Sequence, residues 1–525
     1  MLDDPASFGI KDYNVSLGTY YSKDNSYSKE QLQQMRLNLY SYSPMDLSVE
    51  EQLTYDILCD SLDTRLSFCN YELYAEPLSF SGGMQIELPL LLAEYTFDSE
   101  KDVNEYLTLL SQMDDYLDSV VLFEEEKSKA GLFMSKELCQ LTIDSCEAFL
   151  AKKDEHYLLS TFEQRLNTLN LSNRKKDTYI KKNTSIFHKQ IVPAYEKMIA
   201  SLNNLQDTGK NSLGLCHFPN GTDYYKLLVY ESTGCDDAIG DIYERIEAQR
   251  INDLLVCLDM QEINPTLFEE CEALEYRCED PTSALKTLET RLLADFPQAP
   301  STNYSIKHVD PVLSDYLAPA FYIVAPIDNY MDNAIYINDA DNNQDIYYFT
   351  TLAHEGFPGH LYQTVMSYEY HLMPIRSILN YSGYVEGWAT YIEMLSYDYA
   401  NINEDVASFL SHNQAATLSL YASADIGLHY YGWDEADMYQ FWSSYGICDE
   451  AVIKEITQLL LAEPGNYLKY YVGYIEFLDL KNYAKDLLGS DYSTIEFHRA
   501  ILDIGPAPFE IIKKYFADYY CSPHT

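Results

Sequence analysis

Two histidines and a glutamate lie close together in the stretch 351–363, which reads TLAHEGFPGHLYQ. Imidazole nitrogens bind Zn²⁺, and a carboxylate beside them can act as a general base. His354 and His360 are six residues apart, so a regular helix would point them about 240° apart. Pro358 predicts an interruption between them, because proline removes a backbone donor and clashes with the preceding turn. We therefore expect a zinc site across a broken helix, with His354 and His360 as ligands and Glu355 as the base.

A second stretch, YVEGWATYIE at 384–393, offers a third ligand. Gluzincin-type zinc enzymes take this ligand from a following helix, and Glu386 lies 26 residues beyond the second histidine. Glu369 would be carried away from the metal by the rise of its helix. Glu393 shares a helical face with Glu386 but lies about 10.5 Å further along the axis, so one metal cannot take both. We expect Glu386 to bind, helped by the small glycines at 383 and 387; the alternative is a favourable contact with the helix dipole.

The chain as a whole is strongly acidic. Its 525 residues carry 82 Asp and Glu against 35 Lys and Arg, which gives a formal net charge of −47 and a pI near 4.3. Such a surface repels phosphate backbones, which argues against a nucleic-acid partner. In the simplest interpretation this charge keeps the protein soluble. The alternative is that it attracts cationic or metal-bearing ligands.

Cysteine usage and the N-terminus bear on the compartment. The 11 cysteines are scattered without a C-x-x-C pair, which indicates buried free thiols rather than a disulfide framework or a zinc knuckle. The opening MLDDP contains no basic segment followed by an apolar one, and apolar runs such as Leu88–Ala93 are too short to span a bilayer. We expect no integral membrane segment and a soluble, cytoplasmic chain as given, or an exported or lipid-anchored one if a leader precedes it.

Helical periodicity dominates the elements that must position these groups. The expected helical regions are 27–70 with a split at 43–44, 99–150, 155–205 with a break near 170–173, 236–297, and 345 to the end. Short β-branched and aromatic runs at 320–326 and 333–338 predict two strands. The expected fold is mainly α: a large, bilobed helical body with a small β-sheet beside the active-site helices. We divide it into an N-terminal helical part, 1–209, and a catalytic part, 210–525, most simply as one continuous domain.

The two chemical stretches resemble a known family when taken together. His-Glu-Gly-Phe-Pro-Gly-His followed by Glu-Gly-Trp-Ala is similar to the bacterial domain-of-unknown-function family 885, which is grouped with the zinc metallopeptidases. The resemblance continues through the DIGLH segment at 425–429, the Pro-Gly pair at 464–465, and the FHRAIL segment at 497–502. It covers roughly residues 210–515 well and the N-terminal part only loosely. A metallopeptidase-like body with one zinc per chain is what the resemblance implies.

Further site residues follow only from this resemblance. It implies that His429, Tyr470 and His498 approach the metal cleft as catalytic residues. Tyr470 would donate a hydrogen bond to the developing oxyanion. Asp425 would either orient a ligand histidine through its other ring nitrogen or cap a helix.

The leading hypothesis is a zinc-dependent peptidase in which Glu355 is the general base. The strand at 334–338 could pair with an extended peptide substrate, which would give sequence-tolerant recognition. One alternative is a zinc hydrolase of another amide or ester, with the same ligands and a different pocket. The other is a non-catalytic protein that binds metal or peptide, although the presence of Glu355 argues against it.

Overall fold

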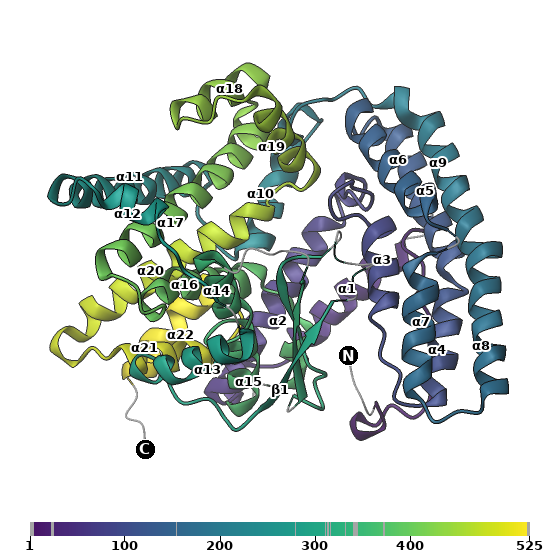
Figure 1. Cartoon of the computed structure of the whole chain (residues 1–525), viewed down its shortest axis with the longest axis horizontal. Coiled ribbons are helices and arrows are strands. Elements are labelled where there is room, and N and C mark those ends of the chain that lie inside the picture. Colours follow the sequence, from purple (N-terminus) through teal and green to yellow (C-terminus); the bar gives the residue numbers. More distant parts are fainter. Residues whose placement is uncertain are drawn as a thin grey trace.

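The computed structural model describes residues 5–521 except 23–25, 154, 279, 310, 312–313, 315–316, 331, 340–344 and 371–372. Within these residues the chain is mainly helical with one small sheet, as predicted. Two helical lobes face each other, and the sheet lies between them at one end (Figure 1). The expected bilobed, mainly α fold is confirmed.

The smaller lobe is a bundle of antiparallel helices. Its helices are α3 (Met84–Ala93), α4 (Glu100–Leu110), α5 (Met113–Ala130), α6 (Lys136–Ala151), α7 (Tyr157–Thr168), α8 (Asn173–Ile186) and α9 (Val192–Leu205). The break predicted near 170–173 falls between α7 and α8. Apolar residues at helical spacing, such as Val103, Tyr106 and Leu110 of α4, form a continuous core inside this bundle.

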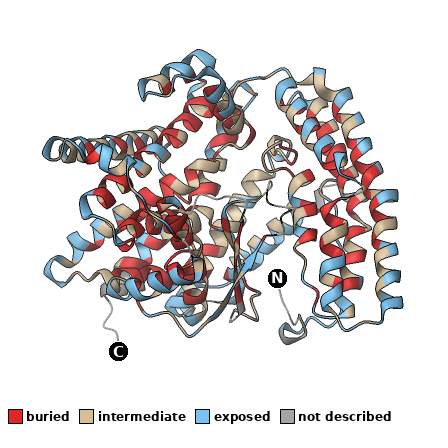
Figure 2. Ribbon diagram, in the orientation of Figure 1, coloured by how far each residue is buried: buried red, intermediate tan, exposed pale blue. Residues whose placement is uncertain are grey.

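The larger lobe holds the predicted metal motif. Its long helices are α10 (Gly221–Thr233), α11 (Ile239–Ile263), α16 (Ser382–Ser396), α17 (Glu404–Ile426) and α20 (Asn466–Leu488). Around them lie α12 (Leu267–Glu272), α13 (Pro281–Arg291), α14 (Ile346–Glu355), α15 (His360–Glu369), α18 (Glu435–Ser444), α19 (Glu450–Ala462), α21 (Thr494–Ile504) and α22 (Phe509–Cys521). Buried residues line the inner faces of these helices, and exposed residues cover the outer faces (Figure 2).

The first two helices, α1 (Ser26–Leu39) and α2 (Val49–Phe68), are separated at residues 43–44 as expected. Leu53 and Ile57 of α2 belong to the core of the larger lobe. Ser48 and Glu51 form a capping box that starts α2. Part of the larger lobe is therefore formed by residues before 209, the expected end of the N-terminal helical part.

The sheet has three strands rather than the two predicted. Its strands are β1 (Asn303–His308), β2 (Ala320–Ile323) and β3 (Asp332–Ile337), in the order β1-β3-β2. β3 pairs in parallel with β1 and antiparallel with β2, so both of its edges are occupied. The expectation that residues 334–338 pair with a substrate is therefore wrong, because an occupied strand has no free backbone groups to offer.

The two faces of the sheet pack against different lobes. Phe321 and Tyr336 pack against the core of the bundle, whereas Ile335 and Ile337 belong to the core of the larger lobe. Alternation of side chains along a strand explains this division. The sheet thus forms a bridge between the lobes. In the described part of the chain, every helix is too short or too polar to cross a lipid bilayer.

Candidate metal centre

The helix that carries the motif is interrupted as predicted. α14 ends at Glu355, α15 begins at His360, and the Phe357–Pro358 peptide bond between them is cis. The backbone N–H of Gly359 donates to the carbonyl of residue 353 at 3.0 Å, and a Cβ at Gly359 would lie 1.8 Å from the carbonyl oxygen of residue 354. Only glycine allows this close return of the chain.

A tryptophan from the second motif holds the interruption in place. The indole Nε1 of Trp388 donates to the carbonyl oxygen of Pro358 at 2.8 Å. Trp388 is fully buried and lies on α16, in the same helical turn as Glu386. The Glu-Gly-Trp-Ala motif therefore supplies both a candidate ligand and the support for the broken helix.

Three donor atoms converge at this point. The Nε2 atoms of His354 and His360 lie 3.7 and 3.4 Å from Glu386 Oε2, and all three donors lie within 4.8 Å of one another. Tetrahedral ligands at 2.0–2.1 Å from a zinc ion are about 3.3–3.4 Å apart. The separations and the N₂O donor set therefore fit one zinc ion with an open coordination position. The side chains are 13% (His354), 15% (His360) and 21% (Glu386) exposed, so a substrate can reach them.

The electrostatic environment favours a cation. Burial alone would raise the pKa of Glu386, but hydrogen bonds and charge from His354 and His360 bring that pKa below its ordinary value. Burial likewise opposes a charge on His354, yet Glu386 and Glu393 raise its pKa well above the ordinary value. The carboxylates therefore stabilise positive charge at this point, whether a proton or a metal ion supplies it.

Glu355, the expected base, has one free carboxylate oxygen. Its Oε2 accepts a hydrogen bond from the backbone N–H of Tyr322 in β2 at 2.9 Å. Its Oε1 lies 3.9 Å from His354 Nε2 and thus faces the three donors. A backbone donor leaves no trace in a sequence, so this contact was not predictable from residue types.

Glu393 orients one of the candidate ligands. Its Oε2 lies 3.3 Å from Nδ1 of His354, on the opposite side of the imidazole from Glu386. A proton held on Nδ1 by this carboxylate leaves the Nε2 lone pair free for a metal. The expected supporting role of Glu393 agrees with this contact.

The glycines of α16 serve helix packing instead of metal approach. A Cβ at Gly387 would lie 2.5 Å from the backbone of Gly473 in α20, and a Cβ at Gly383 would lie 1.9 Å from the carbonyl oxygen of Thr233. These glycines therefore allow the backbones of α20 and α10 to approach α16, and they do not face the metal. The expectation that these glycines help Glu386 to approach the metal is therefore wrong, although Glu386 lies beside both histidines.

Tyr470 lies near the three donors. Burial raises its pKa, and the carboxylates of Glu386 and Glu355 raise it further. The phenol therefore keeps its proton at neutral pH and can donate a hydrogen bond. Tyr470 is in the second turn of α20, next to the glycine contact with α16.

His429 has a structural environment. Its Nδ1 accepts from the backbone N–H of Leu215 at 3.1 Å, and its Nε2 donates to the carbonyl of Leu460 at 3.0 Å. Burial lowers its pKa to about 4. Both ring nitrogens are occupied, so these contacts do not support the catalytic role expected from the resemblance.

Asp425 orients no histidine. It accepts hydrogen bonds from the hydroxyl of Tyr225 and, at 2.8 Å, from the backbone N–H of Gly465 at the start of α20. Of the two roles considered, the helix-end role is the one that these contacts support.

His498 belongs to a separate buried network. Its Nδ1 donates to the carbonyl of Asp295 at 2.7 Å, and its Nε2 is 3.0 Å from the hydroxyl of Tyr391. Lys481 donates to the same hydroxyl at 2.9 Å. Burial lowers the pKa of His498 to about 3, so the ring stays neutral. These contacts tie α16, α20 and α21 together and do not bring His498 to the three donors.

A second group of possible ligands consists of Cys235, Asp237 and Glu476. Arg245 forms ion pairs with Asp237 at 2.6 Å and with Glu476 at 2.7 Å, and Lys513 pairs with Glu476 at 2.9 Å. Two cations already neutralise these carboxylates. The arrangement fits an ion-pair network between helices better than a metal site.

Solved structures share this fold. A provisionally assigned lipoprotein from Colwellia psychrerythraea aligns with a TM-score of 0.86 and 19% identity over 96% of this chain and 92% of its own. A provisionally assigned lipoprotein of unknown function from Shewanella oneidensis aligns with a TM-score of 0.67 and 15% identity, over 95% and 94% of the two chains. A provisionally assigned oligoendopeptidase F from Bacillus anthracis reaches only 0.30 with 12% identity over 97% and 98%, which is too low to establish a shared fold.

Sequence comparison agrees with the resemblance noted in the motifs. No curated protein matches the chain. The model of the family described as "Bacterial protein of unknown function (DUF885)" matches residues 5–515, so the likeness extends through the N-terminal part as well. The chain therefore belongs to the bacterial family DUF885.

Proposed function

We propose that this protein is a zinc-dependent peptidase with one zinc ion per chain. The observation that carries the proposal is the convergence of His354 Nε2, His360 Nε2 and Glu386 Oε2, with Glu355 beside them. Bound zinc would polarise the scissile carbonyl and lower the pKa of a coordinated water to about 7. The residues of the chain would supply proton transfer, orientation and substrate binding.

Glu355 is the candidate for proton transfer. Its Oε1 faces the three donors and can take a proton from the attacking water, then deliver it to the leaving nitrogen. The hydrogen bond from the Tyr322 backbone to Oε2 would hold the carboxylate in one orientation during both steps. Each transfer moves one proton, so the carboxylate is regenerated.

Tyr470 is the candidate for oxyanion stabilisation. Burial and the neighbouring carboxylates keep its hydroxyl protonated. A protonated phenol can donate to the carbonyl oxygen as negative charge develops on it. The support for this role is its proximity to Glu386 and Glu355.

The outer edge of β2 replaces β3 as the candidate peptide-binding edge. Among the described residues β2 pairs with β3 alone, and on that side the carbonyl of Pro319, just before β2, accepts from the N–H of Asn338 at 2.9 Å. The N–H of Tyr322 points away from β3 and donates to Glu355. The edge of β2 opposite β3 therefore borders the three donors. An extended peptide hydrogen-bonded to the backbone groups of this edge other than the Tyr322 N–H, which Glu355 occupies, would present its backbone to the metal centre with little dependence on sequence.

Two other functions share part of this support. A zinc hydrolase of another amide or an ester would use the same residues with a different pocket. The edge of β2 that faces away from β3 and borders the three donors favours a peptide over such substrates. A non-catalytic binding protein would have no use for a carboxylate held as Glu355 is.

The test asks whether the protein hydrolyses peptides and whether removal of the metal abolishes that hydrolysis. Purified protein is incubated with a mixed peptide library and with small amides and esters, with and without chelator, and products are identified by mass spectrometry. Cleavage of peptides that chelator abolishes and zinc restores is expected. Cleavage of amides or esters alone would favour the second function, and no turnover with zinc bound would favour the third.

A further inference from the structure

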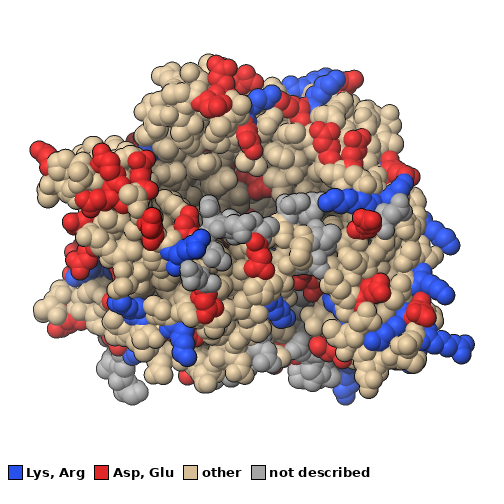
Figure 3. Space-filling view, in the orientation of Figure 1, with Lys and Arg blue, Asp and Glu red and all other residues tan. Residues whose placement is uncertain are grey.

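A cavity of about 320 Å³ lies between the two lobes. This volume is at the lower end of the range for small-ligand pockets, about 300–1,000 Å³. The bundle contributes one wall and the larger lobe the other, and the molecular surface is visibly hollowed between the lobes (Figure 3). The three zinc-ligand candidates do not line it, so it is distinct from the metal centre.

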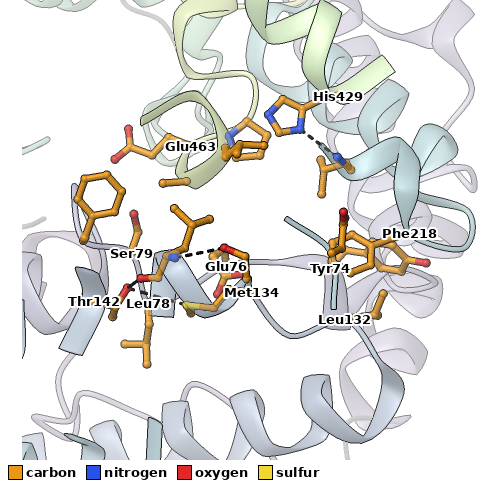
Figure 4. Close-up of a pocket in the computed structure, with 18 of the residues that line it drawn as sticks. Tyr74, Glu76, Leu78, Ser79, Leu132, Met134, Thr142, Phe218, His429 and Glu463 are labelled. Atoms are coloured by element: carbon orange, nitrogen blue, oxygen red, sulfur yellow. Dashed lines mark hydrogen bonds between the residues drawn. The ribbon is translucent and has the colours of Figure 1, made fainter. Parts of the chain in front are cut away.

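The walls of the cavity are mainly apolar. Its apolar side chains include Leu78, Met134 and Leu138 from the bundle and Leu213, Leu228 and Leu461 from the larger lobe. Figure 4 shows Leu78 and Met134 on one wall and His429 on the other. Walls of this kind favour a ligand with an apolar body, because burial removes apolar surface from water.

The charged residues that line the cavity all have the same sign. They are Glu76, Glu87 and Glu463, and none of the described residues that line the cavity is Lys or Arg. Glu76 is already paired with the buried Lys127 at 2.6 Å. The carboxylates of Glu87 and Glu463 form no ion pair or hydrogen bond with any described residue, although Lys469 lies near enough to lower the pKa of Glu87 in part.

Glu87 and Glu463 approach one another across the lobe boundary beside Gly82. A Cβ at Gly82 would lie 3.0 Å from Glu463 Oε1 and 3.6 Å from Glu87 Oε1. Glycine therefore leaves a space between two carboxylates from different lobes. Glu87 is exposed as a whole, yet partial burial of its carboxyl raises the pKa, and the charge of Glu463 raises that pKa further.

The cavity and the metal centre lie close together along the start of α20. Glu463 precedes this helix by three residues, and Tyr470 is in its second turn. The carboxylates of Glu386, Glu355 and Glu463 all raise the pKa of Tyr470, after the effect of burial. The three residues from Glu463 to the start of α20 span at most about 11 Å, and the four from there to Tyr470 advance about 6 Å, whereas an extended peptide covers about 3.3 Å per residue. A peptide at the metal centre can therefore reach the cavity within a few residues.

We propose that the interlobe cavity is a binding site for a cationic group on an apolar stem, with Glu87 and Glu463 recognising the cation. Lysine and arginine side chains have this chemistry, as does the amino terminus of a peptide with an apolar first residue. Apolar walls strengthen the attraction, because Coulomb interactions grow as the dielectric constant falls. The proposal rests on the proposed function only in taking the ligand to be a peptide.

The test measures binding in the Glu355→Gln variant, so that no substrate is consumed. Three peptides with acetylated and amidated ends, identical except for one lysine, norleucine or glutamate, are titrated by calorimetry. A fourth peptide has the norleucine sequence with a free amino terminus. The lysine peptide, the free-amine peptide or both should bind about tenfold tighter than blocked norleucine, and the glutamate peptide more weakly. Which one does so identifies the source of the cation.

Variants in the same background assign the preference to the cavity. The preference is the ratio of the affinity for the tighter-binding cationic peptide, lysine or free-amine, to the affinity for blocked norleucine. Glu463→Gln and Glu87→Gln should reduce this ratio toward one, and added salt should lower it in the parent. Glu455→Gln, an exposed position on α19 that does not line the cavity, should leave the ratio unchanged. Thermal unfolding of each variant checks that it is folded.

The outcomes separate this inference from the proposed function. Equal affinity of the parent for all four peptides, or an unchanged ratio in both cavity variants, would overturn the cavity proposal even if the active protein cleaves peptides. A charge-dependent ratio that the cavity variants abolish would uphold it even if no peptide is hydrolysed, in which case only the peptidase assignment fails.

Discussion

At the scale of single residues, the metal centre depends on carboxylates with different partners. Glu386 lies against both imidazoles, Glu355 is held by a backbone N–H, and Glu393 contacts the far side of His354. These different environments predict different consequences when each carboxylate is replaced.

Replacement of Glu355 by glutamine should separate binding from chemistry. Glutamine keeps the shape and the hydrogen bond from Tyr322 but cannot take a proton, so peptide hydrolysis should fall by about 10²–10⁴-fold. Zinc content, measured by elemental analysis, should remain about one per chain. Hydrolysis at the parental rate would contradict the role of Glu355 as base.

Alanine at 386 and at 393 should have unequal effects on zinc. Glu386→Ala removes a ligand and should abolish stoichiometric binding. Glu393→Ala removes only the partner of His354 Nδ1, so affinity should fall by about 10–100-fold while zinc still binds at stoichiometric concentration. The measurement is competition with a chromogenic chelator, with the exposed Glu369→Ala as control. Retention in Glu386→Ala with loss in Glu393→Ala would reverse the two roles.

At the scale of secondary-structure elements, two helices of the site are held by close backbone contacts. α16 and α20 meet where Gly387 faces Gly473, and this contact fixes Glu386 relative to Tyr470. α20 is also attached to α17 through Asp425, which accepts from the N–H of Gly465.

Gly387→Ala should force α16 and α20 apart. The new Cβ would lie 2.5 Å from the Gly473 backbone, so we expect a loss of about 1–3 kcal/mol in the free energy of unfolding. Urea unfolding measures it. Gly240→Ala in α11 is the matched control: its Cβ would meet only Tyr431 at 3.8 Å, so the substitution should be neutral or slightly stabilising. Equal stability of the two variants would refute the packing argument.

Asp425 should make stability depend on pH. Burial raises its folded-state pKa to about 7, against about 3.9 in an unfolded chain. The folded protein therefore binds the proton more tightly, and the free energy of unfolding contributed by this group should fall as pH rises from about 4 to about 7. Asp425→Asn does not titrate and can still accept from the Gly465 N–H through Oδ1 while its Nδ2 donates to the hydroxyl of Tyr225, so its unfolding curve should depend less on pH across this window. An identical pH dependence in parent and variant would contradict the assignment.

At the scale of the whole molecule, two lobes enclose the cavity, and the sheet joins them at one end. The metal centre lies in the larger lobe, where α14, α15 and α16 meet. A metal ion bound there would join side chains from all three helices.

Metal removal should therefore lower the stability of the folded protein. A ligand at about 100 times its Kd stabilises the folded state by about 2.7 kcal/mol, so chelation should lower the Tm and zinc should restore it. Differential scanning calorimetry with and without chelator measures this. The Tm of Glu386→Ala should be insensitive to chelator; an equal chelator effect in that variant would place the stabilising metal elsewhere.

The local sequence determined the break in the motif helix and the divisions between α1 and α2 and between α7 and α8, because proline and polar residues act on their own few neighbours. The hydrophobic periodicity determined the mainly helical, two-lobed fold. The motif spacing predicted that His354, His360 and Glu386 share one metal. In the structure their donor atoms lie within 4.8 Å of one another.

Contacts between residues distant in sequence were decided only by the tertiary structure. β1 was missed because only two of its residues, Tyr304 and Ile306, contact the core, and the segment becomes a strand by pairing with β3. The sequence alone could not tell that His429 and His498 use both ring nitrogens in the buried interior, since histidine has the same donor and acceptor atoms in a core as in a site. The same holds for the hydrogen bond from the Tyr322 N–H to Glu355 and for the approach of Glu87 to Glu463. In both cases only long-range packing brings the two residues close together.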